Sequence, residues 1–149
     1  MLIINSLILV IVLVSDQLTK NWAETQLQGS EPIPVLNNLF ELHYSQNTGM
    51  AFSFLDDKPQ FLLVLVSVIV ISLIYYIFKE KKLDLGIAFI LAGGLGNLLD
   101  RLVHGYVIDF INPLFMDFAI FNISDIALNI GMALLIFQWL TKEKRVQND

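Results

Sequence analysis

Four long apolar segments limit what this chain can fold into, and they cover residues 2–14, 61–78, 85–99 and 123–140. A helix that crosses a bilayer needs about 20 mostly apolar residues, so the second and fourth segments are long enough by themselves. The first and third reach that length when they continue into their polar flanks, to Trp22 and Arg101. We therefore expect a membrane all-α fold, a bundle of four transmembrane helices over about residues 2–24, 60–79, 84–101 and 123–141.

The composition supports this class. Hydrophobic residues make up 56% of the 149 residues, and the mean hydropathy is +0.67, far from the balance of soluble proteins. The length allows one domain over residues 1–149. The absence of cysteine excludes disulfides, a thiolate nucleophile and a thiolate metal site. Nucleic-acid binding is not expected, because the net charge is −5 and the basic residues form no tail.

The first apolar segment could also be a signal peptide. It lacks a basic region at its start and an A-x-A-like cleavage site, so we expect it to remain as a helix of the bundle.

Basic residues predict the orientation. Six basic residues lie on one side of the membrane, in the loop after the second helix or after the fourth helix, and three lie on the other side. The six are Lys79, Lys81, Lys82, Lys142, Lys144 and Arg145, and the three are Lys20, Lys58 and Arg101. The positive-inside rule then places both termini and the 79–84 loop in the cytoplasm. Residues 15–60 and 101–122 would lie on the outer side.

The first of these outer segments, about residues 28–57, contains short alternating runs such as 39–44, bounded by Pro32 and Pro34. Period-two alternation is typical of a strand. We expect a small extracytoplasmic β element in this segment, and a second outer loop that folds back over residues 111–121, with turns at Gly105 and Pro113.

Four acids lie against or inside the apolar runs: Asp16, Asp100, Asp109 and Asp125. A charge at membrane depth is costly, so such residues indicate a functional site. Two carboxylates in one poorly solvated pocket share a proton, which suits general acid–base catalysis. We take Asp109 and Asp125 as candidates for one catalytic centre.

Helical spacing gathers the polar residues into stripes. Gly93, Asn97 and Asp100 share one face of the third helix, with Arg101 on its flank, and Asn122, Asp125 and Asn129 share one face of the fourth. We expect the second stripe to face the bundle interior, with Asn122 or Ser124 as the helix cap.

Simpler interpretations remain for several of these residues. The glycines at 93, 94 and 96 are more typical of close helix packing. Asp125 could be an ordinary first-turn acid, and Arg101 could form a plain ion pair. Asp16 and Lys20, an acid-first i, i+4 pair, could anchor the helix end or take part in the chemistry.

Other catalytic classes find little support. His43 and His104 are isolated from one another and from cysteine, so no metal site and no cofactor are expected. Ser15 and Lys20 point in different directions on one helix, which argues against a Ser-Lys peptidase.

Five motifs resemble, in chain order, those of the lipoprotein signal peptidases, also called signal peptidase II. They are Asp16-Gln17-Leu18-Thr19-Lys20, Asn47-Thr48-Gly49-Met50-Ala51-Phe52, Gly93-Gly94-Leu95-Gly96-Asn97-Leu98-Leu99-Asp100-Arg101, Val107-Ile108-Asp109-Phe110 and Phe121-Asn122-Ile123-Ser124-Asp125. The resemblance spans nearly the whole chain. Ala92 and Ser124 depart from it, standing where glycine and alanine are usual, and Ser124 could add a hydrogen bond that tunes Asp125.

The resemblance implies an intramembrane aspartic endopeptidase with Asp109 and Asp125 as its catalytic pair. It implies a prolipoprotein substrate, cleaved on the N-terminal side of a cysteine that already carries diacylglycerol. By the same match Asn47, Gly93, Asn97, Arg101 and Asn122 would line the site and hold substrate, and Asp16 would stabilise the active fold. Lys20 and Asp100 would support it.

The partners expected are therefore the lipid-modified prolipoprotein and membrane lipid, with no nucleic acid and no metal, and the protein is expected to be a monomer. The expected location is the bacterial cytoplasmic (inner) membrane, with the active site toward the outer face. The alternative is a small proton- or ion-conducting transporter, in which intramembrane acids form a relay. Clustering of the acids at one membrane face favours the peptidase, and a purely structural anchor does not explain two converging polar stripes.

Overall fold

The computed structural model describes residues 1–37, 39–49 and 59–146. In this part of the chain four helices are long and apolar enough to cross a membrane, which confirms the predicted bundle. They are α1 (Leu2–Leu27), α2 (Pro59–Glu80), α3 (Leu85–Val103) and α4 (Ile123–Val146). Each continues a few residues past one or both of its predicted ends, α4 farthest.

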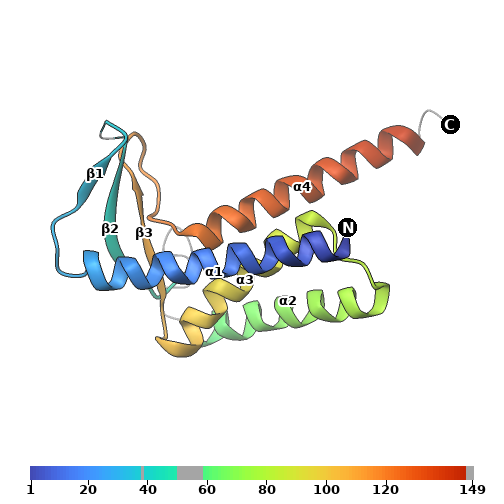
Figure 1. Ribbon diagram of the computed structural model, residues 1–149, viewed down its shortest axis with the longest axis horizontal. Helices are drawn as coiled ribbons and strands as arrows, with labels where there is room; N and C mark the ends of the chain where they lie inside the picture. Colours follow the sequence, from blue (N-terminus) through green and yellow to red (C-terminus); the bar gives the residue numbers. More distant parts are fainter. Residues whose placement is uncertain (38, 50–58, 147–149) are drawn as a thin grey trace.

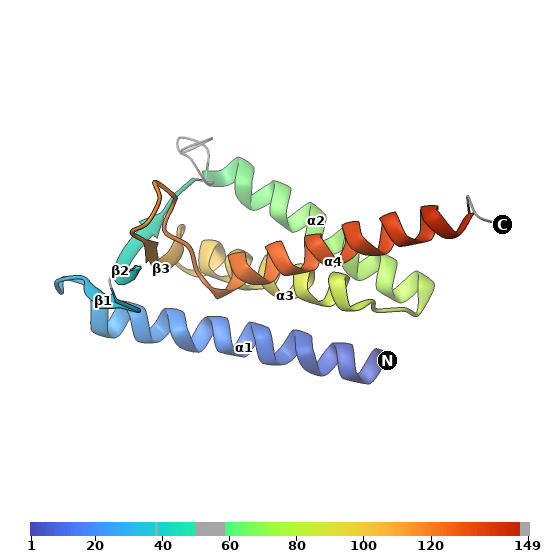
Figure 2. The ribbon, with the colours of Figure 1, turned by 90° about the horizontal axis from the view of Figure 1, so that it is seen from above.

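Helix α3 is the centre of the bundle, and the other three helices pack against it (Figure 2). Small residues allow the closest of these contacts, between α3 and α4. A Cβ added at Gly131 would lie 2.6 Å from the carbonyl oxygen of Gly86, so the two backbones nearly touch there. This close approach of α3 and α4 is the arrangement that glycine allows in membrane helices.

A sheet of three antiparallel strands, in the order β1-β2-β3, lies at one end of the bundle (Figure 1). Its strands are β1 (Ile33–Val35), β2 (Phe40–Asn47) and β3 (Val107–Pro113). The predicted β element in the first outer segment is thus confirmed. The second outer segment is not only a loop, because its first part pairs with β2 as strand β3.

Strand β3 forms because its apolar side chains are buried on both sides. Ile108 and Phe110 pack with Ala23 and Leu27 at the end of α1, while the backbone of β3 pairs with β2. Near-continuous hydrophobicity is typical of a strand covered on both faces.

After β3 the chain folds back as predicted. The backbone N–H groups of Ile111 and Phe121 each donate to the other's carbonyl oxygen, at 2.9 and 3.0 Å. This pairing brings the start of α4 beside β3. At the other end of the strand, Gly105 has a φ of +83°, which lets the chain turn sharply from α3 into β3.

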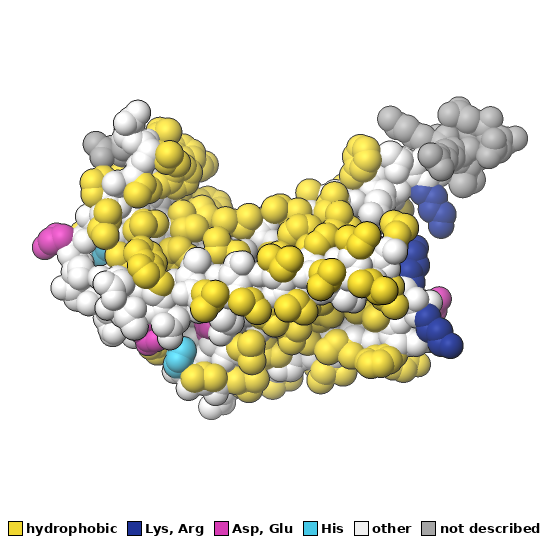
Figure 3. Space-filling view, in the orientation of Figure 1, with side chains coloured by type: hydrophobic (Ala, Val, Ile, Leu, Met, Phe, Trp, Pro, Cys, Tyr) yellow, Lys and Arg dark blue, Asp and Glu magenta, His cyan; other side chains and the backbone are white. Residues whose placement is uncertain are grey.

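The N-terminus and the C-terminal end of α4 lie at the end of the bundle opposite the sheet, together with the α2–α3 connection (Figure 1). Lysine and arginine side chains gather at this same end, whereas the helices between carry mainly hydrophobic side chains (Figure 3). The molecule therefore has a basic end and a sheet end, separated by an apolar band.

The close α3–α4 contact predicts the effect of a substitution on stability. Gly131→Ala should destabilise the protein by about 1–3 kcal/mol, because the new methyl group meets backbone and the helices must separate. Gly94→Ala is the control, since its Cβ would lie 3.2 Å from a methyl group of Val70 and alanine favours the helix. Thermal unfolding in detergent measures both. Equal unfolding temperatures for the two variants would contradict the close contact.

Candidate active site

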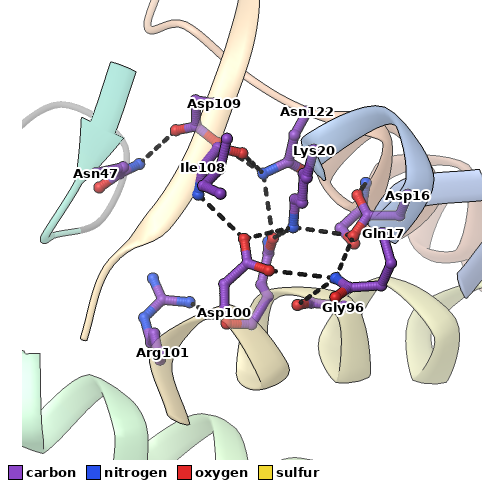
Figure 4. A network of polar contacts seen from close by, with 12 residues as sticks. Asp16, Gln17, Lys20, Asn47, Gly96, Asp100, Arg101, Ile108, Asp109 and Asn122 are labelled. Atoms are coloured by element: carbon purple, nitrogen blue, oxygen red, sulfur yellow. Dashed lines mark hydrogen bonds and ion pairs between the residues drawn. The ribbon is translucent and has the colours of Figure 1, made fainter. Parts of the chain in front are cut away.

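The polar network at the sheet end of the bundle centres on the ammonium group of Lys20 (Figure 4). Its Nζ atom lies 2.9 Å from Asp16 Oδ2 and 3.0 Å from Asp100 Oδ2, and it donates to Asn97 Oδ1 at 2.9 Å. The side chains of Lys20, Asp16 and Asp100 are only 2%, 0% and 3% exposed. All three ammonium hydrogens thus have an oxygen acceptor, which a buried charge requires.

The two carboxylates extend this cluster to other elements. Asp16 Oδ1 accepts a hydrogen bond from the backbone N–H of Ser124 on α4 at 2.7 Å. Asp100 Oδ2 accepts one from the backbone N–H of Ile108 on β3 at 3.0 Å. One buried cluster therefore joins α1, α3, β3 and α4.

Gln17 completes the cluster. Its position on the helix does not indicate this role from the sequence; only its place in the first of the five motifs does. Its Nε2 group donates to Asp16 Oδ2 and to Asp100 Oδ1, both at 3.2 Å. By these hydrogen bonds the amide stabilises the negative charge that the two carboxylates carry in excess of the one ammonium group.

Asp109 lies in the middle of β3 and is held by two amides. Asn122 Nδ2 donates to its Oδ1 at 2.6 Å, and Asn47 Nδ2 donates to its Oδ2 at 2.8 Å. Figure 4 shows the carboxylate between these two side chains, which come from α4's start and from the end of β2.

Asp125 lies in the first turn of α4. Its backbone N–H donates to Asn122 Oδ1 at 2.9 Å, and its Oδ2 accepts from the backbone N–H of Asn122 at 3.1 Å. These reciprocal bonds form a capping box, which confirms Asn122 as the cap and Asp125 as a first-turn acid. Its other oxygen, Oδ1, accepts from Asn97 Nδ2 at 2.8 Å.

Amides link the two candidate catalytic carboxylates. Asn122 Nδ2, which binds Asp109, also donates to Asn97 Oδ1 at 3.1 Å, and Asn97 in turn binds Asp125. Burial, and next the negative charge of Asp125, raise the pKa of Asp109 from 3.8 to about 7, against the hydrogen bonds from Asn47 and Asn122, which lower it. The pair thus has the electrostatics of two acids that hold one proton.

Arg101 does not form the plain ion pair that its neighbours suggested. No carboxylate within the described ranges lies within salt-bridge distance of its guanidinium group. Its Nη2 donates to the carbonyl oxygen of Gly49 at 3.1 Å, and its Nη1 donates to that of Asn97 at 3.3 Å. Arg101 on α3 thus binds the backbone of the chain that follows β2.

Two largely apolar cavities meet at this site, and Asn47, Asp125 and Leu128 line both. One, of about 320 Å³, lies between α2 and α3. The other, of about 620 Å³, lies between residues 118–121 and α4. An apolar chain in either cavity would therefore end beside Asp125.

Three other positions singled out from the sequence are Gly93, Ser124 and Asn129. Gly93 lies at the α3–α4 contact, where an added Cβ would meet the carbonyl oxygen of Ser124, in agreement with the packing interpretation. Ser124 Oγ is buried beside Gly96 and has no hydrogen-bond partner among the described residues, so the hydrogen bond that Ser124 could have added is not formed. Asn129 is exposed and lines the larger cavity, instead of facing the bundle interior.

Among the described residues, no three histidine, cysteine, aspartate or glutamate side chains are placed to hold a metal ion together. Of the two histidines, His104 stacks on Tyr106 with ring centroids 5.6 Å apart. The carboxylates of the site are occupied by amide, ammonium and backbone donors.

Comparison with known proteins identifies the family of this fold and site. Residues 8–141 match the family model described as signal peptidase (SPase) II. The chain belongs to the signal peptidase II family. The resemblance stated from the five motifs is thereby confirmed.

Relatives and solved structures agree over nearly full length. The lipoprotein signal peptidase of Streptococcus pyogenes serotype M2 is 40% identical over 139 residues, 91% of this chain and 90% of the relative. That of Lactococcus lactis subsp. lactis is 32% identical over 145 residues, 95% of this chain and 97% of the relative. A solved bacterial membrane enzyme superposes with a TM-score of 0.86 at 33% identity, covering 95% of this chain and 90% of the other.

The buried cluster of this signal peptidase II fold makes a prediction. Lys20→Met should cost about 3–5 kcal/mol of stability, because it leaves two buried carboxylates without their counter-charge. Lys82→Met is the matched control, since Lys82 is 64% exposed and its ion pair with Asp84 at 3.2 Å lies at the surface. The unfolding temperature in detergent measures both.

A second substitution tests the cause. Adding Asp16→Asn to Lys20→Met removes one of the uncompensated charges, so the double variant should regain part of the lost stability. A double variant less stable than Lys20→Met would show that the charge imbalance is not the cause.

Proposed function

We propose that this protein is an aspartic endopeptidase that removes the signal peptide from prolipoproteins, with Asp109 and Asp125 as its catalytic pair. One observation carries the proposal. The two carboxylates come from different elements, β3 and α4, and yet are held by the same residue: the side-chain Nδ2 of Asn122 binds Asp109, and its backbone N–H binds Asp125. Family membership supports the coarser part, a signal peptidase acting on prolipoproteins.

The chemistry follows from one proton shared by two acids. The ionised carboxylate takes a proton from water as the water oxygen attacks the scissile carbonyl carbon. The protonated carboxyl gives its proton to the carbonyl oxygen, so that a neutral tetrahedral intermediate forms. When the C–N bond breaks, a proton passes to the leaving amine. The products are a signal peptide with a new carboxyl terminus and a lipoprotein with a free amino terminus.

The neighbouring residues would position this pair. Asn47 and Asn122 orient Asp109, while Asn97 orients Asp125. Arg101, by holding the carbonyl of Gly49, would keep the chain next to Asn47 in place for substrate. Gly93 would contribute by allowing α4 to approach α3. Asp16, Lys20 and Asp100 would support the site from behind.

The substrate proposed is a prolipoprotein whose cysteine already carries diacylglycerol, cleaved on the N-terminal side of that cysteine. The two cavities beside Asp125 support an apolar substrate, because a signal-peptide segment and acyl chains are both apolar. No metal or cofactor is needed for this chemistry, and the protein would act as a monomer.

The basic end of the molecule supports the proposed orientation in the bacterial cytoplasmic membrane. The N-terminus, the C-terminal end of α4 and the α2–α3 connection lie at that end (Figure 1), so the positive-inside rule would place them in the cytoplasm. The sheet and the catalytic pair would then lie at the outer face.

The catalytic pair is tested by substitution. Asp109→Asn and Asp125→Asn should each lower cleavage of a lipid-modified precursor peptide by about 10³-fold or more, because neither variant can hold the pair in its singly protonated state. Asp117→Asn is the control, since Asp117 is exposed on the nearby loop, and it should keep full activity. Cleavage is measured by separating precursor and product from purified, folded enzyme.

Normal turnover by either Asn variant would exclude the dyad. The transporter alternative makes the opposite prediction: ion flux in proteoliposomes that depends on Asp109 and Asp125, with no peptide cleavage in the wild type.

The pH dependence provides a third test of the pair. Because the pKa of Asp109 is raised to about 7, the shared proton is present below that pH and is lost as pH rises through it. The value of kcat/KM should therefore fall above pH 7, with an apparent pKa that belongs to the pair.

The variant Asn47→Ala should shift this pH profile. The Asn47 hydrogen bond lowers the pKa of Asp109 by stabilising the ionised form, so its removal should move the falling limb to higher pH. The profile of kcat/KM against pH measures this shift. A limb that stays in place or moves to lower pH would contradict the assignment of Asp109.

A further inference from the structure

The outer tip of the sheet exposes several large apolar side chains. Two segments form this tip, the turn between β1 and β2 and the chain that follows β3. Its exposed members are Leu36 (69% exposed), Leu39 (50%), Leu114 (45%), Phe115 (59%) and Met116 (53%), called here the tip cluster. Contiguous exposed apolar surface of this kind is typical of a contact with a partner or a membrane.

The tip cluster belongs to one ordered unit. The backbone N–H of Leu114 donates to the carbonyl oxygen of Leu39 at 2.9 Å, which joins the two segments. The rings of Phe40 and Phe115 meet edge to face with centroids 5.5 Å apart. The apolar side chains are therefore presented together, on a framework continuous with β2 and β3.

Leu36 has a backbone conformation that its side chain does not favour. Its φ is +51° and that of Asn37 is +54°, both in the left-handed region. Asparagine adopts this region readily, whereas a bulky residue such as leucine there is an outlier. Glycine or asparagine at position 36 would relieve the strain, and the leucine gains no burial within the described fold. A contact outside the chain would account for leucine at this position.

The position of the tip favours lipid as that contact. The strands run across the end of the bundle, so that the tip lies to one side of α4, beyond the bundle (Figure 1). Hydrophobic side chains cover this part of the sheet as well as the helices beside it (Figure 3). Ile120, Ile126 and Ile130 line the larger cavity between residues 118–121 and α4. The chain that follows the tip therefore lies beside the apolar surface of a membrane-spanning helix.

We propose that the tip cluster inserts into the interfacial region of the bilayer leaflet beside α4. Apolar and aromatic side chains at this depth bind the boundary between headgroups and acyl chains. The contact anchors the free end of the sheet, and it thereby restrains β3, the strand that carries Asp109.

The absence of cysteine makes a direct test possible. Single variants Leu36→Cys and Phe115→Cys are labelled with an environment-sensitive fluorophore, and Glu31→Cys is the control, because Glu31 is exposed between α1 and β1. Each protein is placed, one copy per disc, in phosphatidylcholine and phosphatidylglycerol nanodiscs. Quenching is measured with nitroxide on the upper acyl chain of the lipid, and separately with iodide in solution.

Labels at positions 36 and 115 should be quenched about threefold more by the lipid nitroxide than the label at position 31, and less by iodide, since they lie at the interface. Quenching by iodide equal to that at position 31 would place the tip in water and overturn the proposal. Protection from iodide without lipid quenching would indicate that another surface of this chain covers the tip, and would overturn it equally.

A second variant tests whether the cluster itself holds the tip. In a Leu36→Asn, Phe115→Asn background, a label at Met116→Cys should lose most of its lipid quenching; unchanged quenching would count against the cluster as the anchor. These measurements need no peptide cleavage, so the lipid contact stands or falls independently of the proposed peptidase activity.

Discussion

The buried ammonium group of Lys20 is the interaction on which the site depends. Burying three ionised side chains is costly, and it is tolerated only where every hydrogen-bonding group has a partner. Asp16 and Asp100 meet this requirement by accepting backbone N–H groups from Ser124 and Ile108. These two residues immediately precede Asp125 and Asp109 in the sequence. The cluster that neutralises Lys20 therefore also sets the backbone positions from which the two candidate catalytic acids project.

Much of this arrangement could be predicted from the sequence, because the spacing of residues within a helix determines which of them share a face. The apolar segments predicted the four helices, and the spacing of Asn97 and Asp100 placed both on the buried side of α3. Strand β3 could not be predicted in the same way, since it forms only when β2, some sixty residues earlier, pairs with it, and strand preference depends on such context. Arg101 shows the same limit: its partner is the carbonyl oxygen of Gly49, which no side-chain pattern reveals.

Asn122 shows why a structural and a catalytic interpretation of Asp125 need not exclude each other. The capping box that begins α4 uses the backbone N–H and Oδ1 of Asn122, and leaves its Nδ2 group free to bind Asp109 and Asn97. The bonds that start the helix thus also set the direction of one carboxylate and support the other. A first-turn acid is held rigidly for local reasons, and this rigidity is what a catalytic pair requires.

The same burial that suits Asp109 for its proposed catalytic role works against folding. Its pKa in the folded protein is raised from 3.8 to about 7, so the folded state binds a proton more tightly than the unfolded state does. The ionisation of Asp109 therefore lowers the free energy of unfolding. This loss of stability is absent below the unfolded pKa, grows as pH rises between the two pKa values, and is constant above about 7, where it amounts to a few kcal/mol. The hydrogen bonds from Asn47 and Asn122 reduce this loss of stability, because they favour the ionised form of Asp109. The cluster around Lys20 binds β3 through the bond from the backbone N–H of Ile108 to Asp100. It thereby holds the strand in place although the Asp109 carboxylate has no counter-charge, which explains why the two features adjoin.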